Sequence, residues 1–274
     1  MKKLLAILLA ALLVAGMLAG CGGSGSGEDN SLQYIKDKGT LILGLDDAFP
    51  PMGFTDENGE IVGFDIDVAK AVAEELGVEL VLQPVDWASN ETELNSKNVD
   101  CLWNGLSITP SRLEKLTMTK SYMKNRLVII TKSDSGINSL SDMAGKVLGT
   151  QGGNDAATTA LDNNAEFKDS LSNIVEFKDY NMAFQDLKIG GVDAVLVDEA
   201  VGRYYLTTSG EDCKVLDEVL DDSDKYGVGL RKGEEALKNA IDDALVKLEQ
   251  DGTLGKSLKN GSARTSSALS SPGL

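Results

Sequence analysis

The sequence predicts an α/β fold built from two series of strands and helices of similar plan. In the first series, Thr40–Leu45 is a short apolar strand, Asp65–Leu76 an amphipathic helix and Val78–Val85 a second strand. Strand, helix and strand in that order give a parallel sheet. A second observation is an internal repeat: Leu94–Gly105 and Leu187–Asp198 each run through Val-Asp into an apolar strand, with equivalent residues 93 positions apart. Two related α/β halves are therefore expected.

Local signals complete the first series. Asp46–Pro51 is predicted to be a loop because its two prolines cannot continue the preceding strand, and Asp56–Gly59 is predicted to be a hairpin turn. Asp65 and Asp67 suit the positive N-terminus of the following helix, and Gly77 suits its C-cap.

The second series shows the same alternation of strands and helices. In chain order, the expected elements are strand Leu127–Thr131, helix Leu140–Ala144, strand Lys146–Thr150, helix Asp155–Leu161, strand Ile174–Phe177, helix Met182–Ile189, strand Ala194–Val197 and helix Glu199–Leu206. The last predicted element is the helix Glu234–Gln250, whose apolar side chains recur on one face.

Composition excludes several classes of function. The chain has 43 acidic and 26 basic residues and a net charge of −17, which argues against a nucleic acid partner. It has no histidine, so Ser-His-Asp triads, Cys-His pairs and histidine-ligated metal centres are excluded. Cys21, Cys101 and Cys213 are too scattered for a zinc knuckle or a redox pair, and the last two are expected to be free thiols. We therefore expect a binding protein rather than an enzyme, without a metal or other cofactor.

The first 20 residues have the features of a secretory signal. A basic start is followed by a short apolar run that ends in small residues. The run ends at Leu18–Cys21, which resembles the bacterial lipobox and implies cleavage before Cys21 and a diacylglycerol group on its sulfur. That anchor would hold the protein on the extracytoplasmic face of the cell membrane. A plain signal peptide with an incidental cysteine is the alternative.

Two polar segments flank the predicted folded part. Residues 21–31 are rich in glycine and serine and are expected to form a flexible tether. Residues 259–274 are rich in serine and are expected to be disordered.

The two repeats end on chemically different residues. Gly105 in the first copy corresponds to Asp198 in the second, and ligands of open α/β sheets bind beyond the carboxyl ends of strands. The first copy continues to Arg112, which offers a guanidinium, whereas the second ends on a carboxylate. A cation facing an anion suits a zwitterion, so the pattern favours a receptor for an α-amino acid.

Four segments resemble those of a known family. They are Gly63–Val72 (GFDIDVAKAV), Gly105–Arg112 (GLSITPSR), Val197–Glu199 and Gly227–Lys232. Together they are similar to the family 3 bacterial extracellular solute-binding proteins, over roughly residues 32–256.

The resemblance implies a two-lobed, type II periplasmic-binding-protein fold with a mixed sheet and flanking helices in each lobe. Lobe 1 would comprise residues 32–121 and 227–258, lobe 2 residues 122–226, with two hinge segments between them. It also implies a monomer that traps a free amino acid by hinge closure. The partners would be the permease and ATPase subunits of an ABC transporter.

The same resemblance assigns roles at the charged ends of the ligand. Arg112 would pair with the α-carboxylate through its planar fork, with Ser107 and Gly105 completing the shell. Asp198 would accept the ammonium group. It could also cap the helix that begins at Glu199, and both roles are compatible.

The remaining site residues would contact the rest of the ligand. Phe49 and Trp87 align with an aromatic pair that sandwiches the ligand side chain, and Asp46 would face its tip. The presence of Asp46 is compatible with arginine, lysine, glutamine or cystine as the ligand, so it does not decide which amino acid is bound. The other residues expected at the site are Asn104 in lobe 1 and Thr150, Gly152 and Asn154 in lobe 2.

Two other functions stay open. Some proteins that resemble this family are cyclohexadienyl-dehydratase-like enzymes, and Glu199 or Asp155 would be the nominal acid–base residues here. The chain could also be a sensory module that reports ligand occupancy to a receptor.

Overall fold

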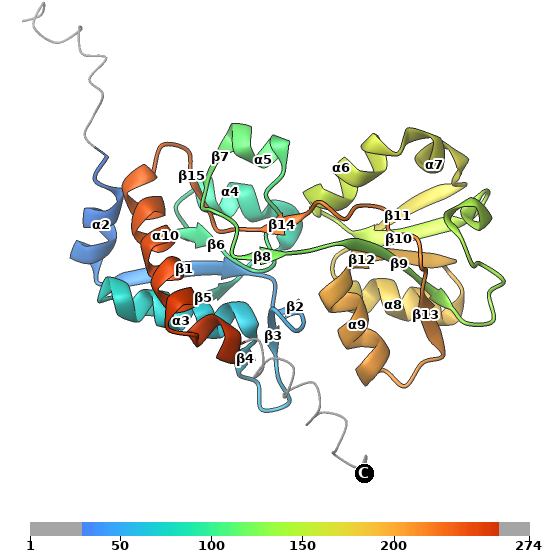
Figure 1. Cartoon of the computed structure of the whole chain (residues 1–274), viewed down its shortest axis with the longest axis horizontal. Helices are drawn as coiled ribbons and strands as arrows, with labels where there is room; N and C mark the ends of the chain where they lie inside the picture. Colours follow the sequence, from blue (N-terminus) through green and yellow to red (C-terminus); the bar gives the residue numbers. More distant parts are fainter. Residues whose placement is uncertain (1–28, 258–274) are drawn as a thin grey trace, which may run out of the picture.

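The computed structural model describes residues 29–257, which form two α/β lobes side by side (Figure 1). Cys21, the predicted signal and the predicted tail at 259–274 lie outside the described residues. The sheet of lobe 1 contains, in spatial order, β5 (Glu79–Pro84), β1 (Thr40–Leu45), β6 (Cys101–Leu102), β15 (Gly229–Arg231) and β7 (Leu116–Met118). The sheet of lobe 2 contains β11 (Asn173–Phe177), β10 (Val147–Gln151), β12 (Ala194–Asp198), β9 (Leu127–Lys132) and β13 (Cys213–Val215).

Both sheets have the same mixed plan. The first three strands of each spatial order are parallel to one another, and the last two are antiparallel to their neighbours. Helices cover lobe 1: α2 (Ser31–Lys38), α3 (Phe64–Leu76), η1 (Trp87–Ser89), α4 (Asn90–Asn95), α5 (Pro110–Lys115) and α10 (Glu235–Gln250). Those of lobe 2 are η2 (Leu140–Met143), α6 (Asp155–Asn163), α7 (Ala165–Ser170), α8 (Tyr180–Ile189) and α9 (Glu199–Thr208).

The sequence repeat is also a repeat in space. The Asp100 carboxylate accepts a hydrogen bond of 2.7 Å from the Ile42 amide, and the Asp193 carboxylate accepts one of 2.8 Å from the Val147 amide. The amides of Asp100 and Asp193 donate in return to the carbonyls of Ile42 and Val147. Each Val-Asp pair therefore fixes the register of the inner strand, β6 or β12, against the strand beside it.

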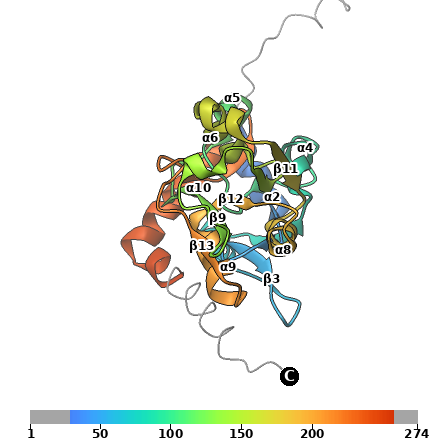
Figure 2. The ribbon, with the colours of Figure 1, turned by 90° about the vertical axis from the view of Figure 1, so that its right-hand side faces the viewer.

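Strands buried on both faces explain the continuous apolar runs. In β9, Leu127 and Ile129 pack against the α6 side of the sheet, whereas Val128 and Ile130 pack against α8 and α9. Successive side chains of a strand point to opposite faces, so one run serves two layers. Figure 2 shows the layers, with α6 on one side of β9 and β12 and the helices α8 and α9 on the other.

Two short crossing strands join the lobes. β8 (Met123–Lys124) and β14 (Lys225–Tyr226) pair antiparallel between the two sheets. A separate antiparallel sheet of β2 (Ala48–Phe49), β3 (Gly53–Thr55) and β4 (Ile61–Val62) lies on the side of lobe 1 that faces lobe 2.

The structure corrects several details of the sequence predictions. The Asp46–Pro51 loop contains the short strand β2, and the predicted helix at 140–144 is a 3-10 helix. The tether predicted at 21–31 ends earlier, since Ser31 begins α2. Asp29 and Ser31 accept hydrogen bonds from the first amides of α10, whose own N-cap residue supplies no side-chain bond. A helix N-terminus needs such acceptors, which explains why this end of the segment is docked.

The two thiols expected to be free are free in the structure. Cys101 is buried in β6, and Cys213 is partly buried in β13. None of the helices within residues 29–257 combines the length and the apolar composition that a membrane crossing needs.

Candidate functional site

The candidate site lies where the strand ends of the two sheets face each other. Asp46 follows β1 and Gly105 lies shortly after β6 in lobe 1, while Gln151 ends β10 and Asp198 ends β12 in lobe 2. Gln151 donates a hydrogen bond of 2.6 Å to the Asp46 carboxylate across the interface. Side chains from both lobes therefore share one buried region.

The loop after β6 is held in a form that needs glycine. Gly105 has φ +60°, and a Cβ there would lie 2.6 Å from the Phe49 ring. Its amide donates a hydrogen bond of 2.6 Å to the carboxylate of Asp65, at the start of α3. Asp65 is fully buried, and burial raises its pKa to about 7 against the opposing effect of that bond. Asp65 thus fixes the loop rather than capping its own helix.

Arg112 places a buried guanidinium beside this loop. Its helix starts at Pro110, and the Thr109 hydroxyl caps it by accepting a bond from the Arg112 amide. The guanidinium donates 3.0 Å to the Ser107 carbonyl and 3.3 Å to the Gly153 carbonyl of lobe 2. Its Nε has no partner within residues 29–257, and burial lowers the pKa of the group. Arg112 is therefore a buried cation at the lobe interface with an unsatisfied hydrogen-bond donor.

Asp198 presents a buried carboxylate from lobe 2. One oxygen accepts bonds from Asn125 (2.5 Å) and Tyr226 (2.8 Å), and the other accepts one of 3.1 Å from Asn154. All three donors are neutral, and within the described residues Asp198 forms no ion pair with lysine or arginine. Burial, followed by the charge of Asp224, raises its pKa to about 7. An added cation would satisfy this carboxylate.

A second carboxylate, Asp224, stands next to Asp198. It precedes the crossing strand β14, and it accepts hydrogen bonds of 2.7 Å from the Asn125 side chain and 2.9 Å from the Ser107 hydroxyl. The Asn125 amide group thus bridges both acids. The Ser107 hydroxyl, which the sequence assigns to the ligand, is used here to join lobe 1 to this crossing segment.

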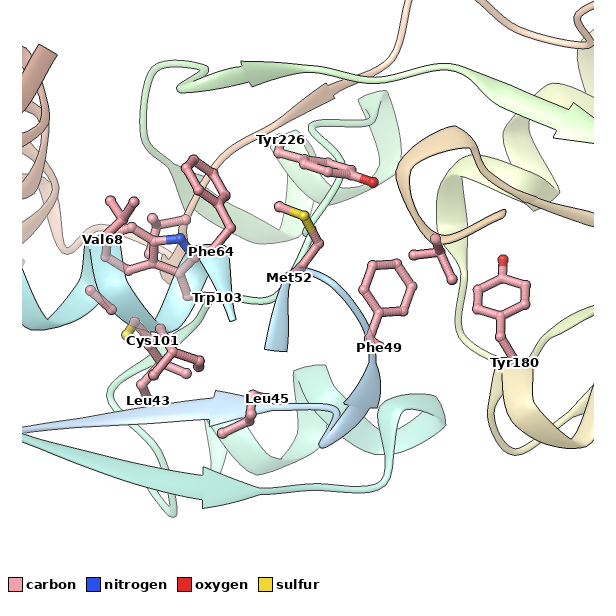
Figure 3. Packing of buried hydrophobic residues seen from close by; sticks show 14 of the residues in the cluster. Leu43, Leu45, Phe49, Met52, Phe64, Val68, Cys101, Trp103, Tyr180 and Tyr226 are labelled. Atoms are coloured by element: carbon pink, nitrogen blue, oxygen red, sulfur yellow. The ribbon is translucent and has the colours of Figure 1, made fainter. Parts of the chain in front are cut away.

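Aromatic rings from both lobes close the region. Phe49 and Tyr180 lie next to each other across the interface (Figure 3), and their ring centroids are 5.8 Å apart. Trp87 belongs to a hydrophobic cluster of lobe 1 with Leu94 and Leu106. The ring that faces Phe49 from the other lobe is therefore that of Tyr180, which the sequence did not single out.

The Asp46 carboxylate is buried, and both of its oxygens accept hydrogen bonds. One oxygen accepts a bond of 2.9 Å from the Ala48 amide and the other the bond from Gln151, while burial raises the pKa of the carboxyl. Asn104 donates 2.8 Å to the Asp46 carbonyl, and its own oxygen lies against Gly53. The Asn104 side chain therefore supports the loop behind Asp46.

Three residues predicted at the lobe 2 loop have separate positions. Thr150 donates to the Leu196 carbonyl at 3.2 Å, and Gly152 has room for a methyl group. Asn154 caps α6, since its oxygen accepts a bond of 3.0 Å from the Ala157 amide, and its nitrogen holds Asp198. Of the three, Asn154 is the one that forms a hydrogen bond with the Asp198 carboxylate.

The lobes also touch at the rim beside Arg112. A pocket of about 270 Å³ there is lined by Trp87 and Arg112 of lobe 1 and by Gly153 and Asp155 of lobe 2. The Thr109 hydroxyl donates a hydrogen bond to the Asp155 carboxylate. These contacts describe two lobes in a closed arrangement.

Sequence reasoning missed four polar groups of the site: Gln151, Asn125, Asp224 and the Tyr226 hydroxyl. One signal could have found the first. Ile42-Leu-Gly-Leu-Asp46 matches Val147-Leu-Gly-Thr-Gln151 at an offset of 105 residues, which differs from the offset of 93 in the first repeat, and this second match aligns Asp46 with Gln151. The others bind protein groups far away in sequence and carry no local pattern.

The chain matches the family model described as "Bacterial extracellular solute-binding proteins, family 3" over residues 41–260. The chain belongs to this family. It is 29% identical over 248 residues to the L-cystine-binding protein TcyJ of Escherichia coli, covering 90% of this chain and 91% of that protein. It is 31% identical over 264 residues to the arginine-binding extracellular protein ArtP of Bacillus subtilis, covering 93% and 96%.

Solved structures of similar proteins share the fold of this family 3 member. An ABC uptake transporter substrate-binding protein from Streptococcus pneumoniae with bound histidine has a TM-score of 0.81 and 36% identity, covering 86% of this chain and 96% of that one. The ancestral amino acid-binding protein AncCDT-1, a precursor of cyclohexadienyl dehydratase, has a TM-score of 0.76 and 31% identity, covering 84% and 98%. The chain therefore has the type II periplasmic-binding-protein fold.

Proposed function

We propose that this family 3 protein captures an L-amino acid between its lobes and delivers it to the permease and ATPase subunits of an ABC transporter. The observation that carries the proposal is the pairing of charges: Arg112 from lobe 1 and Asp198 from lobe 2 are both buried and lack a charged partner of their own within 4 Å in residues 29–257. Buried charges without a counter-charge are costly. An α-carboxylate at Arg112 and an α-ammonium at Asp198 would remove that cost.

The binding free energy of a micromolar ligand is consistent with capture by both lobes. A micromolar dissociation constant corresponds to about 8 kcal/mol. Spread over roughly ten heavy atoms, this is about 0.8 kcal/mol per atom, below the ceiling of about 1.5 for very small ligands. Such efficiency requires both charged ends to be desolvated and paired, which needs groups from both lobes.

The lipid anchor is part of the proposal. Diacylglycerol on Cys21 would keep the folded protein, as a monomer, at the extracytoplasmic face of the membrane and within reach of its permease. Mass spectrometry of the mature protein tests it, since an unmodified N-terminus would contradict it.

The enzyme alternative is the weaker candidate. Glu199 is paired with Arg126 and Arg203, and hydrogen bonding from Arg126 lowers its pKa, so it is a poor general acid. Asp155 is bonded to Thr109 at the lobe interface. Incubation with a prephenate-like substrate and a search for product separates this alternative from binding alone.

A thermal-shift screen of the twenty amino acids and cystine tests the proposed binding. A ligand at 100 times its dissociation constant adds about 2.7 kcal/mol of stability. For a protein of this size this raises Tm by roughly 5–10 °C.

Two arginine variants localise the site. Arg112→Ala is expected to leave the ligand carboxylate buried and unpaired, which costs about 3–5 kcal/mol of binding. Arg203→Ala, on the exposed face of α9, is the matched control and should bind as the natural protein does. Calorimetry that shows equal affinity for both variants would remove Arg112 from the site. Ligand uptake by membrane vesicles with the transporter subunits then separates transport from sensing.

A further inference from the structure

Two buried carboxylates, those of Asp198 and Asp224, are joined through one amide group. The side-chain nitrogen of Asn125 donates 2.5 Å to the Oδ1 of Asp198 and 2.7 Å to the Oδ2 of Asp224. Asn125 follows β8 and Asp224 precedes β14, the two strands that cross between the lobes (Figure 1). The accepting oxygens are therefore no further apart than the length of two hydrogen bonds.

The hydrogen bonds to this pair come from neutral groups. Asp198 also accepts bonds from Tyr226 and Asn154, and Asp224 accepts one of 2.9 Å from the Ser107 hydroxyl. Within the described part of the chain, neither carboxylate forms an ion pair with lysine or arginine. Two buried carboxylates side by side repel each other, and one proton removes that repulsion.

Two tyrosines near Asp198 stay neutral. The Tyr226 hydroxyl of β14 donates 2.8 Å to its carboxylate, and the Tyr180 hydroxyl of α8 accepts 2.8 Å from the Asn154 amide group that also bonds Asp198. Burial, followed by the negative charge of Asp198, raises the pKa of both hydroxyls. Neither tyrosine therefore adds a charge to the pair.

The charged residues near the pair are engaged elsewhere. Burial lowers the pKa of Arg112 in α5, and Asp224 and Asp198 are among the acids whose charges oppose this effect. The Arg112 guanidinium nevertheless donates to backbone carbonyls and not to either carboxylate. Glu199, which follows Asp198, is paired with two arginines. A positive charge in contact with the pair must therefore come from a ligand or a proton.

The pair is built on lobe 2 and the crossing segments. Asp198 ends β12 and pairs with Leu127 of β9, whose amide donates 2.8 Å to the Asp221 carbonyl, three residues before Asp224. Among the donors to the two carboxylates, Ser107 is the one that comes from lobe 1. The two acids should therefore stay together when the lobes separate, and an entering amino acid meets them as a pair.

We propose that Asp198 and Asp224 form an acid pair that holds one proton while no ligand is bound and releases it when the ligand ammonium arrives. The inference rests on the proposed amino-acid binding and adds Asp224 to it as a positioning residue, which acts through Asp198. The proton passes to the solvent, and the ammonium keeps its own three protons and supplies the positive charge. Burial and the charge of Asp224 raise the pKa of Asp198 to about 7, so the proton is held below pH 7 and is lost above it.

Asp224→Asn removes the charge of Asp224 and can keep its hydrogen bonds. The Ser107 hydroxyl and the Asn125 amide group both donate to the same oxygen, Oδ2. An asparagine with its carbonyl oxygen in that place accepts both bonds. The substitution thus changes the charge beside Asp198, and the pKa of Asp198 should fall by about one unit or more.

Isothermal titration of the whole protein in phosphate and in Tris counts the protons released, because the two buffers take up a proton with different heats. The probe is the L-amino acid that gives the largest rise in Tm in the thermal-shift screen, with histidine set aside because its side chain titrates in the same range. The natural protein is expected to release about 0.9 proton at pH 6 and about 0.1 at pH 8. Asp224→Asn should release about half a proton or less at pH 6.

The pH profile separates this role from a structural one. Between pH 8 and pH 5 the dissociation constant should rise about 100-fold for the natural protein and about tenfold or less for Asp224→Asn. A structural role would weaken binding by the same factor at every pH and leave the proton count unchanged, and that result would overturn the assignment of Asp224. Asp224→Glu keeps the charge and should restore the release.

An exposed acid in the same crossing segment provides the matched control. Asp222→Asn removes one negative charge two residues before Asp224, at a side chain that is open to solvent. Because an exposed charge is screened, this variant should release as many protons as the natural protein. A loss of release as large as that of Asp224→Asn would assign the effect to net charge and overturn the acid pair.

The outcomes distinguish the acid pair from the proposed function. Binding of the probe at pH 6 with release of less than about 0.3 proton by the natural protein would overturn the acid pair and leave amino-acid capture intact. This measurement needs no variant, so it holds even where a substitution prevents folding. No binding of any amino acid below about 1 mM would overturn both. Circular dichroism and Tm establish that each variant is folded before it is compared.

Discussion

The Asp65 carboxylate at the start of α3 accepts a hydrogen bond of 2.6 Å from the Gly105 amide, 40 residues further along the chain. Asp65 is fully buried, and Gly105 belongs to the loop that leads to Ser107 and Arg112. An acidic residue that suits a helix N-terminus is thus used to hold the carboxylate-binding loop proposed for lobe 1. This hydrogen bond therefore joins two of the four segments that resemble the family, Gly63–Val72 and Gly105–Arg112.

Removing the Asp65 carboxylate should weaken ligand binding, although Asp65 is not itself expected to contact the ligand. Asp65→Ala leaves the Gly105 amide buried and unpaired, at a cost of about 1–3 kcal/mol. Because the loop then shifts, calorimetry should show a weaker affinity for the best amino acid. Asp65→Asn keeps an acceptor and should bind within about threefold of the natural protein. Glu74→Gln, on the exposed side of α3, controls for the loss of charge, and unchanged binding by Asp65→Ala would contradict the role.

Asp65 should also make the stability of the free protein depend on pH. Its pKa in the folded protein is about 7, above its ordinary value of 3.8, so the folded state holds this proton more tightly than the unfolded chain. Its contribution is therefore complete below about pH 4 and is lost as the pH rises to 7. Asp65→Asn removes this loss, so the variant should gain stability relative to the natural protein by up to about 1.4 kcal/mol per pH unit. Urea unfolding at pH 5 and pH 8 measures it; an equal difference at both values would contradict it.

A pH dependence of a different origin is expected for ligand binding. Asp198 has a pKa of about 7 in the closed structure, and the ligand ammonium requires it ionised. Below pH 7 the proton must leave first, so the dissociation constant should fall by about tenfold per pH unit from 5 to 6 and level off above 7. Asp198→Asn should bind weakly with a flat profile between pH 5 and 8. A flat profile for the natural protein would contradict the assignment of Asp198.

Gly105 should be far less replaceable than another glycine with the same backbone conformation. Gly39, the C-cap of α2, has φ +73° and nothing within 4 Å of the place a Cβ would take, whereas Gly105 has φ +60° and the Phe49 ring at 2.6 Å. Gly39→Ala should lose about 1–2 kcal/mol of stability from backbone strain alone. Gly105→Ala should lose about 1–3 kcal/mol more from overpacking, and also ligand affinity. Thermal unfolding and calorimetry check both, and equal losses would contradict the clash.

The fold was predictable where apolar periodicity runs long enough. β1, β9, β12, α3 and α10 lie within two residues of their predicted ends, because a two-sided sheet or an amphipathic helix leaves a clear pattern. The elements that escaped prediction are short or charged: α2 contains Lys36, Asp37 and Lys38, and several strands have only two or three residues. Their conformation depends on contacts with other elements, such as the pairing of β8 with β14.

The site was predictable only in part. The sequence places Gly105 and Asp198 at strand ends and Arg112 in the segment that follows Gly105. The structure brings Asp46 and Asn154 to the same region. The network that orients them is not local: Ser107 and Asp224 are 117 residues apart, and Asn125 and Asp198 are 73 apart. Such contacts depend on how the lobes and crossing strands meet, which no short pattern records.

The contact between the lobes leaves no room for a side chain at Gly153. A Cβ at this residue would lie 2.7 Å from the Trp87 carbonyl and 2.9 Å from the Ala88 Cα, both backbone atoms of lobe 1. Backbone cannot move aside as a flexible side chain can, so Gly153→Ala should keep the lobes apart. We expect a loss of about 1–3 kcal/mol in ligand binding from the overpacked interface.

The neighbouring glycine provides the control for this prediction. At Gly152 the nearest atom to a Cβ is 3.6 Å away, and its backbone conformation is an ordinary one, so Gly152→Ala should bind within about threefold of the natural protein. Gly153 also has φ +77°, so the variant loses some stability from strain, and Tm without ligand measures that part separately. Small-angle scattering then decides the cause: Gly153→Ala should fail to contract when ligand is added, whereas normal contraction would show that closure tolerates the methyl group.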